Sequence, residues 1–192
     1  MGAATIVTQD KIKSITMEAV VIRANGREEN LGIIGEYSGT WGVWLKRRFQ
    51  NMIHALKNER GMATLQVNTG RAIVTSRITG GGTEPKQIGW GTSAGTTAAG
   101  DTTLFGEKDV DLTTGTGTRT SGTSSQVTTS TTNDTYQVTG TRTATGAGTV
   151  TNAGLFDNAT IGSGNLYMKG DFTGIGLSSG DAIAFTIKVQ YS

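Results

Sequence analysis

Apolar and polar residues alternate over several segments of the chain, and this two-residue period is typical of β-strands with one buried face. The alternation is clearest over residues 183–191, at the end of the sequence. One face there would carry five apolar or aromatic side chains, those of Ile183, Phe185, Ile187, Val189 and Tyr191. The pattern predicts a closing strand that packs against a core.

Residues 4–37 also have the character of strands. Apolar residues occupy every second position from Ile15 to Val21, and Asn25-Gly26 follows them. That dipeptide favours a tight hairpin turn because both residues tolerate positive φ. We expect the chain to pair back on itself through residues 31–37.

The hydrophobic period changes between residues 40 and 58, where apolar side chains recur at steps of three and four. This is the period of an amphipathic helix. The apolar face would hold Trp41, Trp44, Leu45, Phe49, Met52, Ile53 and Leu56. Lys46, Arg47 and Lys57 lie on the polar face, whereas Arg48 projects among the apolar residues. Arg48 would extend its charge to water, pair with an acidic residue, or anchor a partner subunit.

The pattern after this helix predicts a second hairpin over Met62–Ile78, followed by a joint at the three glycines 80–82. We place a domain boundary there. Residues 1–80 would form an N-terminal region of strands plus one helix. Residues 81–192 would form a run of short strands with a turn signal about every ten residues, which is typical of sandwiches and jelly rolls.

Within the second part, Leu112–Thr149 is close to low complexity. Threonine fills 16 of its 38 positions, and only Arg119, Asp134 and Arg142 are charged. Disorder is one interpretation of such a composition. However, residues 127–138 alternate around Asn133-Asp134, which would suit the tip of a hairpin. The predicted fold class is therefore mainly β: a jelly-roll-like antiparallel β-sandwich with an N-terminal β-plus-one-helix region.

Composition narrows the possible functions. The chain has no cysteine and one histidine, which excludes disulfide scaffolds, thiolate metal sites and most triads built on histidine. Its net charge of +2 is too small to indicate nucleic-acid binding. No apolar stretch is long enough for a signal peptide or a membrane span, so we expect synthesis in a cytoplasm and no membrane partner.

Candidate chemistry is sparse. Glu107, Asp109 and Asp111 alternate, and three carboxylates on one strand face could bind calcium. No EF-hand pattern supports this, so a strand facing water or a basic partner is the preferred interpretation. Paired carboxylates can serve glycoside hydrolysis, but Asp101, Asp157, Asp171 and Asp181 each stand beside Gly or Asn, which favours turn positions instead. We predict no enzymatic activity, and no catalytic, cofactor or metal site.

Residues 83–107, TEPKQIGWGTSAGTTAAGDTTLFGE, resemble a family of tailed-bacteriophage virion proteins. The resemblance continues through VTNAGLFD at 150–157, GNLYMKGDF at 164–172 and IGLSSGD at 175–181. Gln87 departs from it where an aromatic residue is usual, and so does the long threonine tract. Trp90, Leu104, Leu155 and Phe156 are expected core residues within these blocks.

The resemblance implies a jelly-roll sandwich and a role on the virion as a decoration (cement) or fibre protein. We expect a protein on the outer capsid surface that binds and stabilises the assembled lattice of the major capsid protein. Its other partner would be itself, as a homotrimer or, second, a dimer. Candidate interface residues are Lys46, Arg47, Arg48, Lys57, Asn133 and Asp134. The alternative is a head or tail fibre component that binds host-surface glycans.

Overall fold

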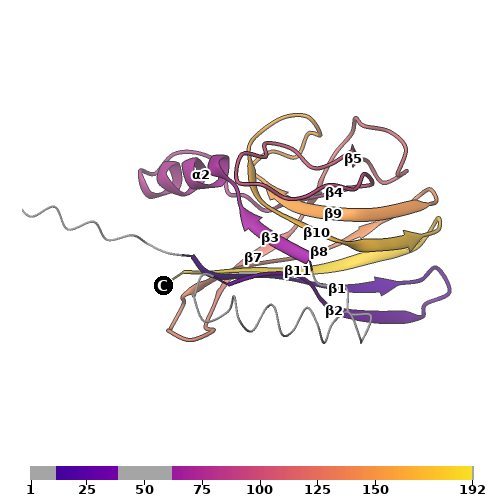
Figure 1. Ribbon diagram of the computed structural model, residues 1–192, viewed down its shortest axis with the longest axis horizontal. Coiled ribbons are helices and arrows are strands. Elements are labelled where there is room, and N and C mark those ends of the chain that lie inside the picture. Colours follow the sequence, from indigo (N-terminus) through magenta and orange to yellow (C-terminus); the bar gives the residue numbers. More distant parts are fainter. Residues whose placement is uncertain (1–11, 39–61, 192) are drawn as a thin grey trace, which may run out of the picture.

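The computed structural model describes residues 12–38 and 62–191 (Figure 1). The predicted helix at 40–58 lies outside these residues, together with Lys46, Arg47, Arg48 and Lys57. The elements are β1 (Ile12–Ile22), β2 (Glu28–Ser38), β3 (Met62–Gln66), α2 (Asn68–Ile78), β4 (Gln87–Gly91), β5 (Glu107–Lys108), β6 (Thr120–Ser121), β7 (Thr123–Val127), β8 (Thr135–Thr143), β9 (Gly148–Phe156), β10 (Leu166–Leu177) and β11 (Ala182–Tyr191).

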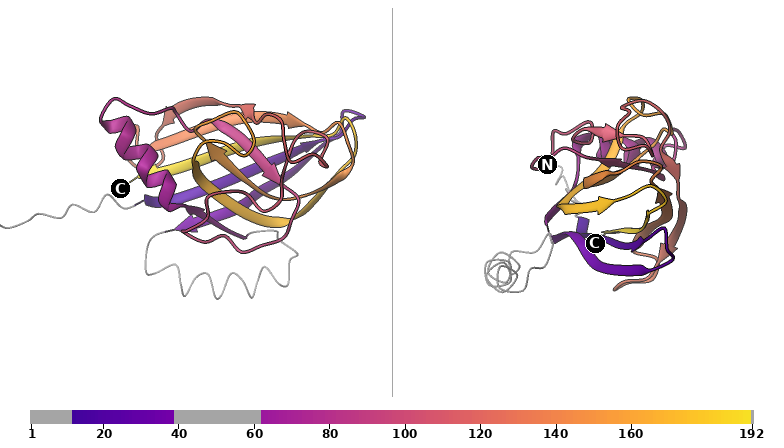
Figure 2. Two further views of the ribbon diagram at one scale, coloured as in Figure 1. Left: turned by 90° about the horizontal axis from the view of Figure 1, so that it is seen from above. Right: turned by 90° about the vertical axis from the view of Figure 1, so that its right-hand side faces the viewer.

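The protein is mainly β, with two antiparallel sheets stacked as a sandwich (Figure 2). The first sheet has the order β7-β8-β11-β1-β2, and the second has the order β5-β4-β9-β10-β3. The mainly-β, sandwich-like prediction is confirmed, and the jelly-roll assignment stays a prediction. The first β-hairpin is also as predicted: β1 and β2 pair antiparallel, and Gly26 has φ +80° in the turn.

Strands shared between the sheets join them along both sides. On one side β3 pairs antiparallel with β10 and parallel with β2. On the other side β6 pairs with β4, the chain passes Gly122, and β7 then pairs with β8. A Cβ on Gly122 would lie 2.5 Å from Val138 Cγ1, so glycine allows this close crossing. The two sheets are therefore connected along both sides, while β7 remains at the end of the strand order.

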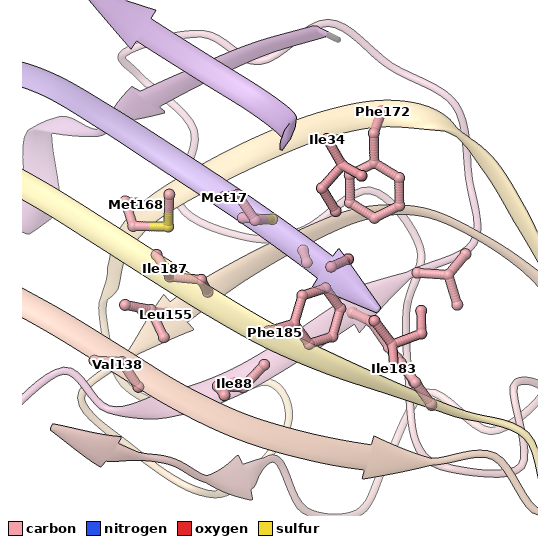
Figure 3. Close-up of a cluster of buried hydrophobic side chains, with 14 of the residues drawn as sticks. Met17, Ile34, Ile88, Val138, Leu155, Met168, Phe172, Ile183, Phe185 and Ile187 are labelled. Carbon is pink, nitrogen blue, oxygen red and sulfur yellow. The ribbon is translucent and has the colours of Figure 1, made fainter. Parts of the chain in front are cut away.

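The main core lies between the two sheets (Figure 3). The first sheet contributes side chains such as Met17, Val138 and Phe185, and the second contributes Ile88 and Leu155. The alternation predicted for the last strand is confirmed, because the side chains at 183, 185, 187 and 189 are all buried. Trp90, Leu104, Leu155 and Phe156 are also buried, as expected from their blocks.

The hairpin predicted over Met62–Ile78 is wrong. The chain forms β3 and then turns directly into α2, which packs on β10. Gly70 makes this packing possible, since a Cβ there would lie 2.1 Å from the Tyr167 carbonyl oxygen. Ile73 is buried, whereas Ile78 is 77% exposed, so only some of the apolar residues of α2 face the rest of the protein. Tertiary contact outweighs the β-propensity of Ile, Val and Thr here.

The sequence boundary at about residue 80 does not separate the sheets. β1 pairs with β11 over ten residue pairs, from Ile12 with Tyr191 to Ile22 with Ala182. β3 likewise pairs with β10. Strands from both predicted parts therefore build each sheet. The assignment of residues 1–80 to capsid attachment stays a prediction.

Candidate interaction surface

The threonine-rich tract forms the outer border of the first sheet. β7 and β8 pair antiparallel from Thr123 opposite Thr139 to Val127 opposite Thr135, and a loop over residues 128–134 connects them. The predicted hairpin around Asn133-Asp134 is thus confirmed. β7 stands at one end of the strand order, with β8 as its neighbour. A terminal strand has backbone groups available for pairing with a further chain.

The outer face of the first sheet continues this border as a polar surface. The residues facing outward occupy matching register positions on four strands: Ser125 on β7, Gln137 and Thr139 on β8, Thr186 and Lys188 on β11, and Thr16 and Glu18 on β1. Lys188 Nζ lies 3.5 Å from Glu18 Oε1, both side chains being partly exposed. A broad face of hydroxyl and amide groups suits adhesion through many weak contacts.

Asp134 organises the loop between β7 and β8. Its carboxylate accepts hydrogen bonds from the backbone N–H groups of Thr129, Ser130 and Thr131, at 2.9, 3.0 and 3.0 Å. Gln190 Nε2 on β11 donates a further bond at 2.7 Å. Burial acts to raise the pKa of Asp134, but the bonds from Gln190 and the loop backbone hold that pKa well below its usual range.

The two interface candidates in this loop have different surroundings. Asn133 is exposed, with φ +60° at the loop tip. Asp134 is partly buried, and its oxygens are engaged within the chain. The roles of Asn133 and Asp134 at an interface stay predictions. The Asp134 carboxylate holds the loop to β11 through hydrogen bonds within the chain.

Arg119 anchors the start of the tract. Its guanidinium forms two hydrogen bonds with the carboxylate of Glu107, at 2.6 and 2.9 Å, and stacks over the ring of Phe156. Its Nη1 also donates to the carbonyl oxygens of Asn158, Thr160 and Ser163. The Arg119 side chain is 1% exposed. The paired fork geometry is one that arginine provides and lysine does not.

Arg142 anchors the other end of the tract in a similar way. Its side chain is 1% exposed, and Nη2 lies 3.1 Å from Asp109 Oδ1. Nη1 donates to the Thr118 carbonyl oxygen at 2.9 Å, and the guanidinium lies over the Trp90 ring. Burial lowers the pKa of Arg142, and the Asp109 carboxylate opposes that effect.

The strand of three carboxylates facing water or a basic partner is a wrong prediction. β5 covers only Glu107–Lys108, so the alternation ends there. Glu107 pairs with Arg119, Asp109 pairs with Arg142, and Asp111 accepts bonds from Thr113 and Thr114 in a turn. Among the described residues, no group of three or more His, Asp or Glu is placed to hold a metal ion.

A charged cluster on the outer face of β10 went unpredicted. Lys169 is fully buried, its Nζ lies 3.0 Å from Asp101 Oδ2, and Asp171 follows on the same strand face. Burial lowers the pKa of Lys169, while Asp101 and Asp171 oppose that effect. The available signal was the segment Met-Lys-Gly-Asp-Phe, which places two charges at alternate positions between apolar residues.

The same loop region contains one further sequence feature. Gly91-Thr-Ser-Ala-Gly95 fits the pattern of a serine-nucleophile turn, which requires a helix directly after the strand. Instead β4 ends at Gly91, and residues 92–106 follow as a loop. That loop covers Lys169 through Asp101 and Phe105.

In the part of the chain described, no helix is both long and apolar enough to cross a membrane.

Comparison with known proteins leaves the sequence and the geometry as the basis for assigning a function. No protein-family model, curated protein or solved structure matches the chain.

Proposed function

We propose that the protein is a structural component of a tailed-bacteriophage virion, a decoration (cement) protein on the outer capsid surface. It binds the assembled lattice of the major capsid protein without turning over a substrate. Binding that favours the assembled lattice stabilises that state by mass action. A homotrimer fits a closed lattice axis, and a dimer is the second expectation.

The observation that carries the proposal is the position of the blocks that resemble virion proteins. The block at 83–107 supplies β4 and the loop after it, and the later blocks supply most of β9 and β10. Trp90 and Leu155 from these blocks are fully buried. The resembling residues are thus concentrated in a structural framework, which favours a scaffold protein over an enzyme.

The β7 border supports adhesion as the mode of action. Thr123 is exposed on β7, which has only polar side chains before Val127. A strand from a capsid subunit or from a second copy could extend the first sheet at this border. The proposed contact is therefore backbone pairing along β7, with the threonine-rich outer face lying against the partner.

A pair of matched variants tests this contact. Thr123→Lys places a charge on the β7 border, and Thr173→Lys makes the same change at an exposed position of β10 in the other sheet. Binding to purified empty capsids of the cognate phage is measured by co-sedimentation. We expect Thr123→Lys to weaken binding by about tenfold, equivalent to about 1.4 kcal/mol. Thr173→Lys should bind as the parent does.

The same assay includes host cells, so that the fibre alternative has its own readout. Saturable binding to capsids, with higher capsid rupture temperature, supports the cement role. Binding to host cells that free glycans compete away, with no binding to capsids, overturns it in favour of a fibre protein. Equal capsid binding by both lysine variants would contradict the β7 contact.

A further inference from the structure

Lys169 lies in surroundings that differ from those of an ordinary ion pair. The side chain is fully buried on the outer face of β10, beneath the loop over residues 92–106. Its Nζ lies 3.0 Å from Asp101 Oδ2 and 2.8 Å from the centre of the Phe105 ring. The Thr103 carbonyl oxygen is 3.3 Å away. Burial away from water lowers the pKa of Lys169 and so weakens its preference for the charged form, although Asp101 and Asp171 oppose this effect.

Asp171 is the second unusual member of this cluster. It is 4% exposed and accepts the backbone N–H of Thr97 through Oδ2. Its other oxygen, Oδ1, is buried and has no hydrogen-bond partner among the described residues. Lys169 and Asp171 are two positions apart on one strand and therefore share a face. Burying a carboxylate oxygen without a hydrogen-bond donor costs free energy, because the oxygen loses its bonds to water and gains none within the protein.

We propose that Lys169 and Asp101 become joined by an intramolecular isopeptide bond, with Asp171 transferring the proton. The site is then a self-modification centre rather than a simple salt bridge. Three features support the reaction: a buried primary amine, a carboxyl group in contact with it, and a second carboxyl group on the same strand face with one oxygen that has no hydrogen-bond partner among the described residues. Such fixed proximity replaces an encounter between free groups and lowers the barrier substantially.

The reaction is a condensation that needs no external reagent. The Lys169 ammonium gives one proton to the Asp171 carboxylate, which passes it to the Asp101 carboxylate. The neutral Nζ then attacks Cγ of Asp101, and a bond forms between Nζ and Cγ. Nζ loses a second proton through Asp171 to the departing hydroxyl group of Asp101, the bond between Cγ and that oxygen breaks, and one water molecule leaves. The products are an amide and water, and Asp171 is regenerated.

The other ion pairs of the protein lack this combination. Arg119 and Arg142 are buried beside carboxylates, but a guanidinium remains charged and is a poor nucleophile. Lys188 and Glu18 provide an amine and a carboxylate, but both are about a third or more exposed. Water there solvates both charged groups. Lys169 is the buried lysine among the described ion pairs.

The bond would fasten the covering loop to β10 across 68 positions of sequence. It would hold the loop even when the sandwich is strained. This inference does not depend on the virion proposal, because it concerns chemistry within one chain. Either proposal can fail while the other stands.

Mass spectrometry of the denatured full-length protein tests the bond directly. We expect an intact mass lower than the sequence mass by one water molecule. Trypsin should leave Lys169 uncut and release a branched peptide, with residues 87–108 joined to residues 143–188. The Lys169→Arg variant should show the full mass. The Lys188→Arg variant is the matched control and should retain the loss of water.

Asp171→Asn tests the proton-transfer role, since it keeps the shape of the side chain but not its basicity. We expect this variant to fold and to show the full, uncross-linked mass. A cross-link formed in Asp171→Asn as completely as in the parent would overturn the role of Asp171. A parent protein of full mass, cleaved by trypsin after Lys169, would overturn the isopeptide bond itself. That measurement requires no variant to fold.

Discussion

β8 and β11 lie side by side in the first sheet, yet they attach to the core by different means. β11 buries apolar side chains at alternate positions, including Phe185 and Ile187. β8 buries a single large apolar side chain, Val138, together with the cation of Arg142. Arg142 stands directly opposite Ile183 in the register. A strand poor in apolar residues can therefore hold its place through a buried, hydrogen-bonded charge.

The largest expected effect on stability comes from removing an apolar core side chain of β11. Phe185→Ala removes a ring that is 1% exposed in the main core, and a cavity would remain between the sheets. We expect a loss of about 4 kcal/mol in the free energy of unfolding, from the combined transfer and cavity costs. Urea unfolding followed by tryptophan fluorescence measures it. A loss below about 1 kcal/mol would show that the sheets collapse onto the vacated space.

The next largest effect on stability comes from removing the buried charge of β8. Arg142→Ala leaves Asp109 and the Thr118 carbonyl oxygen without their donor. We expect a loss of about 3 kcal/mol, the lower end for a broken buried pair, because the Asp109 side chain is 26% exposed and can reach water. Arg71→Ala, at an exposed position of α2, is the control and should be close to neutral. If Arg142→Ala were equally neutral, β8 would not depend on its buried charge.

The two strands also differ in how much of their packing the sequence predicts. Alternation was enough to predict β11 and the first hairpin, since each apolar residue reports its own burial. The charges Arg119 and Arg142 stood out within a threonine-rich tract, but their partners Glu107 and Asp109 lie far along the chain. No local pattern specifies such pairs. The Lys169 cluster was not predicted for the same reason. The helix α2 was not predicted because its packing depends on the close approach of Gly70 to β10, which no local sequence pattern indicates.

A smaller effect concerns the crossing that carries the tract from one sheet to the other. Gly122→Ala would place a Cβ 2.5 Å from Val138 Cγ1 and 3.0 Å from the Thr139 carbonyl oxygen. We expect a loss of about 1–3 kcal/mol from overpacking. Gly176→Ala on β10 is the control, because no atom lies within 4 Å of its added methyl group. Thermal melts that shift equally for both variants would contradict the close crossing.

The smallest effect should arise in the loop that joins β7 and β8, where charge acts near water. Asp134→Asn removes the anion that accepts bonds from Thr129, Ser130 and Gln190. We expect a modest decrease in melting temperature at pH 7. The pKa of Asp134 is lower in the folded state than in the unfolded chain. The carboxylate therefore stabilises the fold above the unfolded pKa of about 3.9, and this contribution is lost as pH falls toward the folded pKa.

Melting curves of the parent and Asp134→Asn between pH 7 and pH 3 should consequently converge as the solution becomes acidic. The gap is expected to be widest above about pH 5 and to narrow below about pH 4. Added salt should narrow it at pH 7 as well, since the loop is partly exposed to screening ions. A gap that stays constant across this range would mean that the shape of Asp134, rather than its charge, holds the loop to β11. In that case the tract would be anchored by charge only at its two arginines.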